Sequence, residues 1–251
     1  MKYAIISDVH GNYPALTKVL EDASLNKVDN FIFLGNYISD LPFSSEAVHT
    51  IMNLDNSYAV AGSKEILLRE LQKVKQKDWI AEQLDSVCQT FRELPDEVRD
   101  YLIKLEEYLF IPLGSGKCIY VAHELRTSIR YTKNYYSSTK SRKIILNSPF
   151  SRQEFRIEFS EFLKHDDLLS TLRHINASVF LYGHKHIQGY GYCNGKLIIN
   201  PGSCGQSPDS DNRTSYTILE ETANKFTVTE RQLTYSDVSV QPCQIRLNEN
   251  R

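Results

Sequence analysis

The chain has 251 residues, of which 41% are hydrophobic and 24% charged, a balance that supports a sizeable core and excludes an intrinsically disordered protein. Its formal net charge of −2 lacks the basic excess of proteins that bind nucleic-acid backbones, so we expect no such binding. The first apolar run is interrupted by Asp8 and is far shorter than the core of a signal peptide.

No later stretch has the apolar length needed to span a bilayer, and we expect no membrane association. The five cysteines are scattered along the chain without a C-x-x-C pair, which argues against a disulfide framework or a zinc knuckle. We therefore expect a reducing, cytoplasmic location. The sequence does not indicate an oligomeric state.

The first quarter of the chain alternates between two kinds of apolar pattern. Short apolar runs at residues 3–6, 31–34 and 58–61 alternate with helical apolar spacing at residues 13–24 and 45–54. This order predicts three parallel strands that are joined by right-handed helical crossovers.

The middle of the chain contains three segments of different composition: a helix-rich segment, a predicted hairpin and a polar segment. Residues 65–107 are rich in helix formers and are broken by Pro95, which predicts two or three helices. Apolar runs at residues 110–113 and 117–122 flank a glycine-containing turn and predict a hairpin. Residues 126–156 are polar with little periodicity, and we expect a long surface excursion there.

The last part of the chain is predicted to return to the sheet. A helix at residues 160–175 leads to a strand at residues 178–182. We expect one domain over residues 1–235 and a C-terminal tail at residues 236–251. Later strands are predicted at residues 189–193, 196–199, 215–220 and 225–233.

Metal-binding side chains recur where the apolar runs stop. The first run is followed by Asp8 and His10, the hairpin by His123, and the next strand by His184 and His186. Because the carboxyl ends of neighbouring strands converge on one crevice, these five residues are predicted to meet. Imidazole plus carboxylate is the ligand mixture of Zn, Mn and Fe sites. One such residue is usually only part of the polar surface, so it is the ordered set that indicates a site.

The ordered motifs resemble those of the calcineurin-like metallophosphoesterases over residues 1 to about 233. That family shows D-x-H-G, G-D, G-N-H-[DE], H and G-H-x-H in this order. Residues 200–205, N-P-G-S-C-G, also resemble a turn of the small bacterial branch of the family. The corresponding segments here are D-V-H-G-N at 8–12, G-N-Y at 35–37, G-S-K-E at 62–65, His123, and G-H-K-H at 183–186.

The resemblance implies an α/β fold, a four-layer sandwich of two mixed sheets flanked by helices, with the metal site at the carboxyl ends of strands. It assigns Asp8, His10 and His186 to one divalent ion, His123 and His184 to a second, and position 36 to both. The family's chemistry is two-metal hydrolysis of phosphate esters. It implies Mn, Fe or Zn as the metal and a small phosphorylated molecule as substrate or ligand.

Three positions depart from the family pattern. Asn36 stands where the family has its bridging Asp, Ser63 where it has a metal-binding Asn, and Lys64 where it has a His. An amide offers one neutral oxygen and a serine is a weaker ligand, so the site at His123 and His184 is weakened. We therefore expect one metal site rather than two to be retained well.

Lys64 has three interpretations: it stabilises phosphate directly, partly replaces a missing cation, or lies solvated at the start of a helix. We name Lys64 and His123 as candidate catalytic residues. Asn12, Lys64 and Arg213 are candidate substrate-binding residues, although Asn12 also suits the turn after the first motif and Arg213 equally suits a surface salt bridge.

Two functions remain open on the sequence alone. The retained ligands favour a metal-dependent phosphomonoesterase or phosphodiesterase of full or reduced activity. The three adjacent departures favour a non-catalytic pseudoenzyme that keeps the fold and at most one metal, and that binds a phosphorylated ligand or a protein partner.

Overall fold

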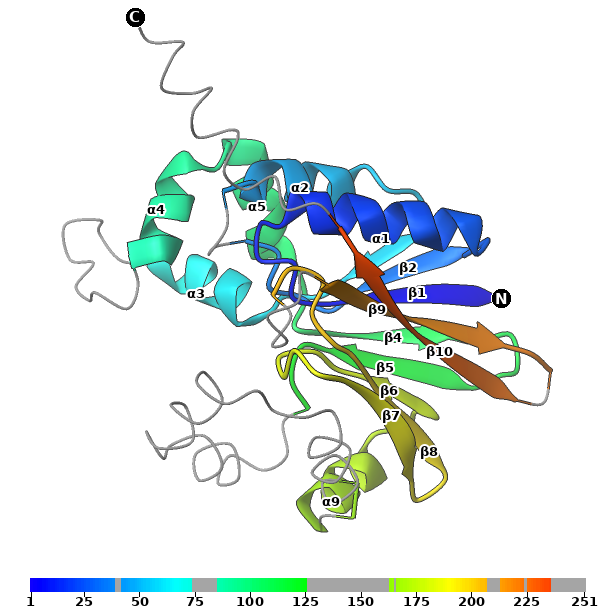
Figure 1. The fold of residues 1–251 in the computed structure, drawn as a ribbon. Helices are drawn as coiled ribbons and strands as arrows, with labels where there is room; N and C mark the ends of the chain where they lie inside the picture. Colours follow the sequence, from blue (N-terminus) through cyan, green and yellow to red (C-terminus); the bar gives the residue numbers. More distant parts are fainter. Residues whose placement is uncertain are drawn as a thin grey trace, which may run out of the picture.

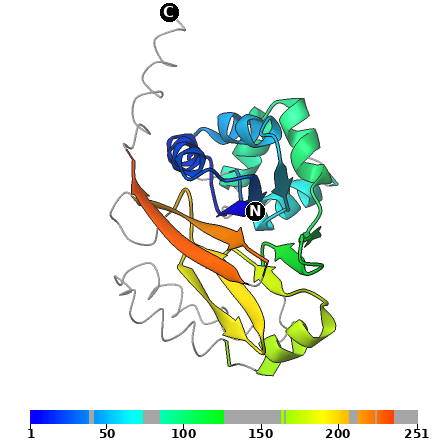
Figure 2. The same ribbon diagram turned by 90° about the vertical axis from the view of Figure 1, so that its right-hand side faces the viewer.

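The described residues form two five-stranded sheets with helices on their outer faces, and Figures 1 and 2 show these layers from two directions. The predicted excursion at residues 126–156 and the predicted tail at residues 236–251 lie outside them, and the single domain stays a prediction. The computed structural model describes residues 1–38, 42–73, 85–125, 163–164, 166–206, 213–223 and 225–235.

The first sheet combines the N-terminal strands with the last two. Its order is β10 (Phe226–Thr234), β9 (Arg213–Glu221), β1 (Lys2–Ile6), β2 (Asn30–Phe33) and β3 (Ser57–Ala59). β1, β2 and β3 run parallel, which confirms the prediction for the first quarter of the chain, whereas β9 and β10 are antiparallel to their neighbours.

The second sheet is built from the middle of the chain. Its order is β4 (Tyr108–Pro112), β5 (Cys118–Ala122), β6 (Val179–Leu181), β8 (Lys196–Pro201) and β7 (Gln188–Cys193). β5, β6 and β8 are parallel, and the two edge strands are antiparallel to their neighbours. The pairing of β4 with β5 confirms the predicted hairpin.

The helices are divided between the two outer faces. Figure 1 shows α1, α2 and α5 over the first sheet and α9 on the far side of the second. Pro95 separates α4 from α5 as predicted, and no described helix is long and apolar enough to cross a membrane. The helices are α1 (Tyr13–Leu25), α2 (Ser44–Met52), α3 (Ser63–Leu71), α4 (Asp85–Glu93), α5 (Asp96–Lys104) and α9 (Asp166–His174).

Side chains alternate between separate cores along the strands. In β1, Tyr3 and Ile5 lie in the core between the sheets, whereas Ala4 and Ile6 lie in the core under the helices. Phe180 of β6 belongs to a third core, between the second sheet and α9. These cores confirm the four-layer α/β sandwich. A one-residue slip would exchange the faces of a strand, so burial also fixes where the polar residues after each strand lie.

Asp22 joins α1 to the antiparallel edge of the first sheet. Its carboxylate accepts hydrogen bonds from Tyr216 Oη at 2.6 Å and from Arg231 Nε at 2.9 Å and Nη2 at 2.7 Å. The Arg231 guanidinium lowers the pKa of Asp22, against the opposing effect of burial. The ion pair therefore stabilises the folded chain in its charged form.

We expect Asp22→Asn to lower the free energy of unfolding by about 2 kcal/mol at pH 7, because charge-assisted hydrogen bonds are lost. The folded pKa of Asp22 is lowered, so its stabilisation is present above the unfolded value of about 3.9 and is lost as the pH falls through the folded value. Urea unfolding from pH 7 to pH 3 should show the difference shrinking. A difference that persists at pH 3, or an equal loss in Glu21→Gln on the same helix, would contradict this role.

Candidate metal centre

The loops that follow the strands are hydrogen-bonded to one another through their backbones. Asp8 N donates to the Gly35 carbonyl at 3.0 Å, which links the loops after β1 and β2. Gly183 N donates to the His123 carbonyl at 3.0 Å, and Gly205 N donates to the Asp8 carbonyl at 2.9 Å. The strand ends of both sheets therefore meet at one place, as the strand order predicts.

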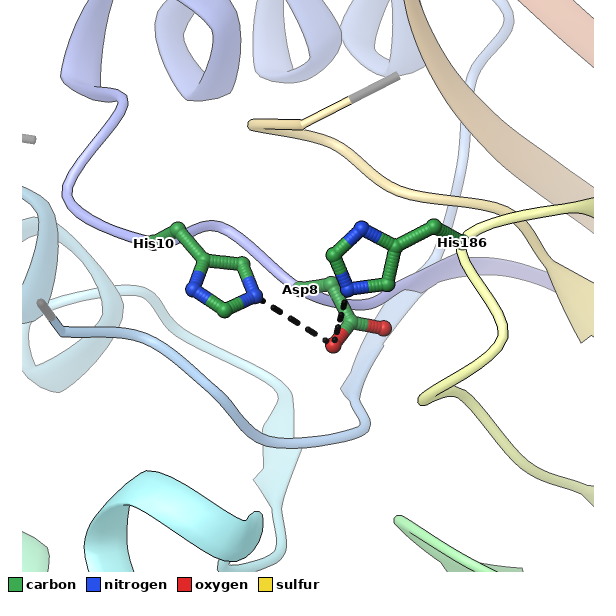
Figure 3. A group of neighbouring side chains, drawn as sticks. All are labelled: Asp8, His10 and His186. Atoms are coloured by element: carbon green, nitrogen blue, oxygen red, sulfur yellow. Dashed lines mark ion pairs between the residues drawn. The ribbon is translucent and has the colours of Figure 1, made fainter. Parts of the chain in front are cut away.

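One ligand group comprises Asp8, His10 and His186, whose ligand atoms all lie within 4.8 Å of one another. Figure 3 shows both imidazoles directed at the Asp8 carboxylate. Asp8 Oδ1 is 3.6 Å from His10 Nε2 and 3.3 Å from His186 Nε2. Both distances exceed the length of a strong charge-assisted hydrogen bond. Two atoms that each bind one tetrahedral ion at about 2.1 Å lie about 3.4 Å apart, so this spacing fits a metal ion.

The charge of Asp8 and the hydrogen bonding of His186 also favour binding of a cation by this group. Burial alone would raise the pKa of Asp8, but the His10 and His186 side chains at its carboxylate hold that pKa well below its usual range. His186 Nδ1 lies 3.0 Å from the Gln206 carbonyl and donates to it, so Nε2 presents its lone pair to the site. Metal-binding histidines typically donate their second N–H in this way.

The backbone of the site is strained. Five site residues adopt left-handed φ angles: Asp8 (55°), His10 (50°), Asn36 (57°), His184 (66°) and His186 (59°). Only eight non-glycine residues in the described part of the chain have positive φ, so most of this strain gathers here. Each such residue costs on the order of 1 kcal/mol or more and persists only where its surroundings enforce it. Strain of this kind is typical of functional sites.

Asn36 connects Asp8 to the start of α3. Its Nδ2 donates to Asp8 Oδ1 at 3.0 Å, and its Oδ1 accepts from Lys64 N at 3.0 Å and Ser63 Oγ at 3.1 Å. The carboxylate acceptor and the backbone donor fix the orientation of the amide. The oxygen that the family resemblance makes a metal ligand thus faces two donors, and its metal role stays a prediction.

Glu65 holds the loops after β2 and β3, a contact that the sequence did not predict, although Glu65 matches the acidic position of the family motif. Its fully buried carboxylate accepts from Asn36 N at 2.8 Å, Tyr37 N at 2.9 Å and Gly62 N at 2.8 Å. These hydrogen bonds hold the backbone of Asn36 where its side chain contacts Asp8. The signals in the sequence were this motif position and a carboxylate suited to the first turn of a helix, and neither indicates contacts with the loop after β2.

The turn after β8 wraps around the backbone that carries the first motif. Ser203 Oγ donates to the Asp8 carbonyl at 2.9 Å, and Asn200 Nδ2 donates to the Gly183 carbonyl at 2.9 Å. A Cβ at Gly183 would overlap Ser7 Oγ, so only glycine permits this close approach. The N-P-G-S-x-G motif therefore positions the ligands of both sheets.

A second ligand group comprises His123, Glu124 and His184, whose ligand atoms also lie within 4.8 Å of one another. His184 Nδ1 lies 3.4 Å from Glu124 Oε1. Burial lowers the pKa of His184, and Glu124 opposes that effect. Burial also lowers the pKa of the neighbouring Lys185 to about 8. Sequence reasoning missed Glu124, because adjacency to His123 was its only signal.

The other predicted site residues make structural contacts. Asn12 caps α1, and its Nδ2 donates to the Gly205 carbonyl at 2.9 Å and to Tyr235 Oη at 2.7 Å. Arg213 begins β9, where its Nη1 donates to Gln232 Oε1 at 3.1 Å. The substrate-binding roles of Asn12 and Arg213 stay predictions.

Comparison with known families agrees with this geometry. A family model described as "Calcineurin-like phosphoesterase" matches residues 1–188. The chain belongs to the calcineurin-like phosphoesterase family. A second model, described as "Calcineurin-like phosphoesterase superfamily domain", matches residues 154–224. A comparison with curated proteins finds no match.

Several solved structures share the fold of this chain. A metallophosphoesterase from Sphaerobacter thermophilus is 21% identical with a TM-score of 0.64, covering 94% of this chain and 89% of its own. A hypothetical protein from Pyrococcus horikoshii is 17% identical with a TM-score of 0.65, covering 99% and 93%. A Vps29 double mutant from Entamoeba histolytica is 17% identical with a TM-score of 0.50, covering 95% of each chain. At these identities the likeness shows the fold alone.

We expect Glu65→Gln to lower the free energy of unfolding by about 2 kcal/mol, because the amide nitrogen that replaces one oxygen faces a buried backbone N–H instead of accepting from it. The control is Glu70→Gln, on the exposed side of the same helix, where a change within about 0.5 kcal/mol is expected. Chemical denaturation of both variants measures the difference. Equal losses in the two variants would contradict the positioning role of Glu65.

Proposed function

We propose that this protein is a metal-dependent phosphoesterase that hydrolyses phosphomonoesters or phosphodiesters with Mn, Fe or Zn. The observation that carries the proposal is the group Asp8, His10 and His186: one buried, anionic carboxylate and two imidazoles at the spacing of ligands around one ion. Membership of the family supplies the reaction class.

A divalent ion held by this group supplies Lewis acidity for the phosphoryl group and lowers the pKa of water. Asp8 provides the negative charge that attracts the ion, and His10 and His186 fix where the ion lies. Asn36 holds one carboxylate oxygen of Asp8 by donating to it. The loops after the strands bury this carboxylate completely, which strengthens its attraction for a cation.

Lys64 is the residue that we propose for phosphate binding. It lies in the first turn of α3, and its backbone N–H donates to the same Asn36 amide that contacts Asp8. The ammonium group and the positive end of the helix dipole both favour an anion at this position. The proposed ligand is therefore a small phosphorylated molecule bound between the start of α3 and the metal centre.

Retention of both histidine pairs favours the enzyme over the non-catalytic binder. A pseudoenzyme of the kind considered above needs at most one ion, and nothing in its function would keep His123 and His184 together at a second ligand group. The proposal therefore places catalysis, and not only recognition of a phosphorylated partner, at this centre.

Hydrolysis of an aryl phosphate and of an aryl phosphodiester with added Mn²⁺ tests the proposal. We expect Asp8→Asn to lower the rate on the order of a hundredfold or more, because the ion loses its anionic ligand. The control is Asp100→Asn on the exposed side of α5, which should keep the wild-type rate. A wild-type protein that turns over neither substrate faster than Asp8→Asn would overturn the proposal.

A further inference from the structure

The second ligand group contains a carboxylate at a position where the family pattern has none. The pattern that the sequence resembles has a single His at position 123 and its bridging Asp at position 36. This chain has Glu124 directly after His123 and the neutral Asn36. Compared with the family pattern, this chain therefore lacks the negative charge at position 36 and has an additional one at position 124.

The spacing of Glu124 fits metal coordination better than a hydrogen bond. Its Oε1 lies 3.4 Å from His184 Nδ1, beyond the range of about 2.7–2.9 Å for charge-assisted hydrogen bonds. It matches the separation of about 3.4 Å between two ligands of one tetrahedral ion. The same spacing occurs at the Asp8 group, where the ligand pairs are 3.3 Å and 3.6 Å apart.

His123 is prepared for a ligand on its free ring nitrogen. Its Nδ1 donates to the Leu34 carbonyl at 2.7 Å, which leaves the Nε2 lone pair available. That nitrogen is buried and finds no hydrogen-bond partner among the described residues, in a side chain that is 4% exposed. A buried acceptor without a partner costs free energy, and a bound cation would remove that cost.

The family's own ligand is not available to this group. The Asn36 oxygen accepts from Lys64 N and Ser63 Oγ and carries no charge. Two neutral imidazoles alone would hold a dication weakly, since no anion offsets its charge. We infer that Glu124 is a ligand of a second divalent ion together with His123 and His184, and that it replaces the carboxylate missing at position 36. This inference rests on the proposed metal-dependent phosphoesterase.

Moving the carboxylate changes how the two ions interact. A bridging Asp touches both ions and screens their repulsion, so each ion favours the other. Glu124 belongs to the second group and not to the Asp8 group. The two ions are therefore expected to bind in separate steps, with the Asp8 group filled first because its carboxylate is completely buried.

Titration of metal-depleted protein with Zn²⁺ against a chromophoric chelator tests this assignment. We expect two ions per chain in separate steps. Glu124→Gln should weaken one step at least on the order of tenfold and leave the other unchanged, and His10→Ala should weaken the opposite step. Glu21→Gln on α1 should leave both steps unchanged. Because Glu124 is 37% exposed, its substitution is expected to keep the fold, which unfolding curves check.

Adding Asn36→Asp to Glu124→Gln completes the test, because it restores a carboxylate at the family position. We expect this double variant to recover the weakened step. One ion per wild-type chain, or unchanged steps in Glu124→Gln, would overturn the assignment of Glu124. If the double variant does not recover the weakened binding step, the claim that Glu124 replaces the carboxylate missing at position 36 is overturned. If the wild-type protein binds two ions in the expected steps but hydrolyses neither aryl phosphate nor aryl phosphodiester, the proposed function is contradicted and the assignment of Glu124 as a ligand still holds.

Discussion

The site depends on a carboxylate that is completely buried at the junction of the two sheets. Asp8 stays charged there because the His10 and His186 side chains lower its pKa against the effect of burial. Polar groups of several loops also contact the carboxylate: Ser7 Oγ at 2.6 Å and His184 N at 3.0 Å contact Oδ2, and Asn36 Nδ2 at 3.0 Å contacts Oδ1. Removing a charge from water is costly unless such partners are fixed in advance. The left-handed turns, the close glycine contacts and the buried Glu65 all hold these partners in place, so the architecture of the loops keeps one carboxylate both buried and charged.

The departures at positions 36, 63 and 64 behave as one change rather than three. An amide at position 36 can donate to Asp8 and accept from Ser63 and Lys64 at the same time. A carboxylate there would face Asp8 directly and would depend on a bridging ion to offset the repulsion. With Asn36 the loops keep their contacts without that ion. On the assignment that we infer for Glu124, this change would uncouple the two metal positions, and Glu124 would supply the charge that the second position needs.

The sequence was informative where apolar residues recur with a regular period and where metal-binding side chains directly follow a predicted strand. Apolar periodicity predicted the layers, and histidines after successive strands predicted which loops would meet. The contacts of Glu65 and Glu124 escaped this reasoning, although Glu65 matches a motif position, because they join loops distant in sequence and no period marks such contacts. Asn12 caps α1 and holds the turn after β8 through its hydrogen bonds, which agrees with the turn role that the sequence also suggested, and its substrate-binding role stays a prediction.

The central claim is that the Asp8 group is a metal site, and anomalous scattering from crystals grown with Zn²⁺ tests it most directly. The account predicts an anomalous peak about 2.0–2.2 Å from Asp8 Oδ1, His10 Nε2 and His186 Nε2 at the same time. An ordered Asp8 group that shows no peak in the presence of excess Zn²⁺, with the two imidazoles hydrogen-bonded to the carboxylate instead, would contradict it.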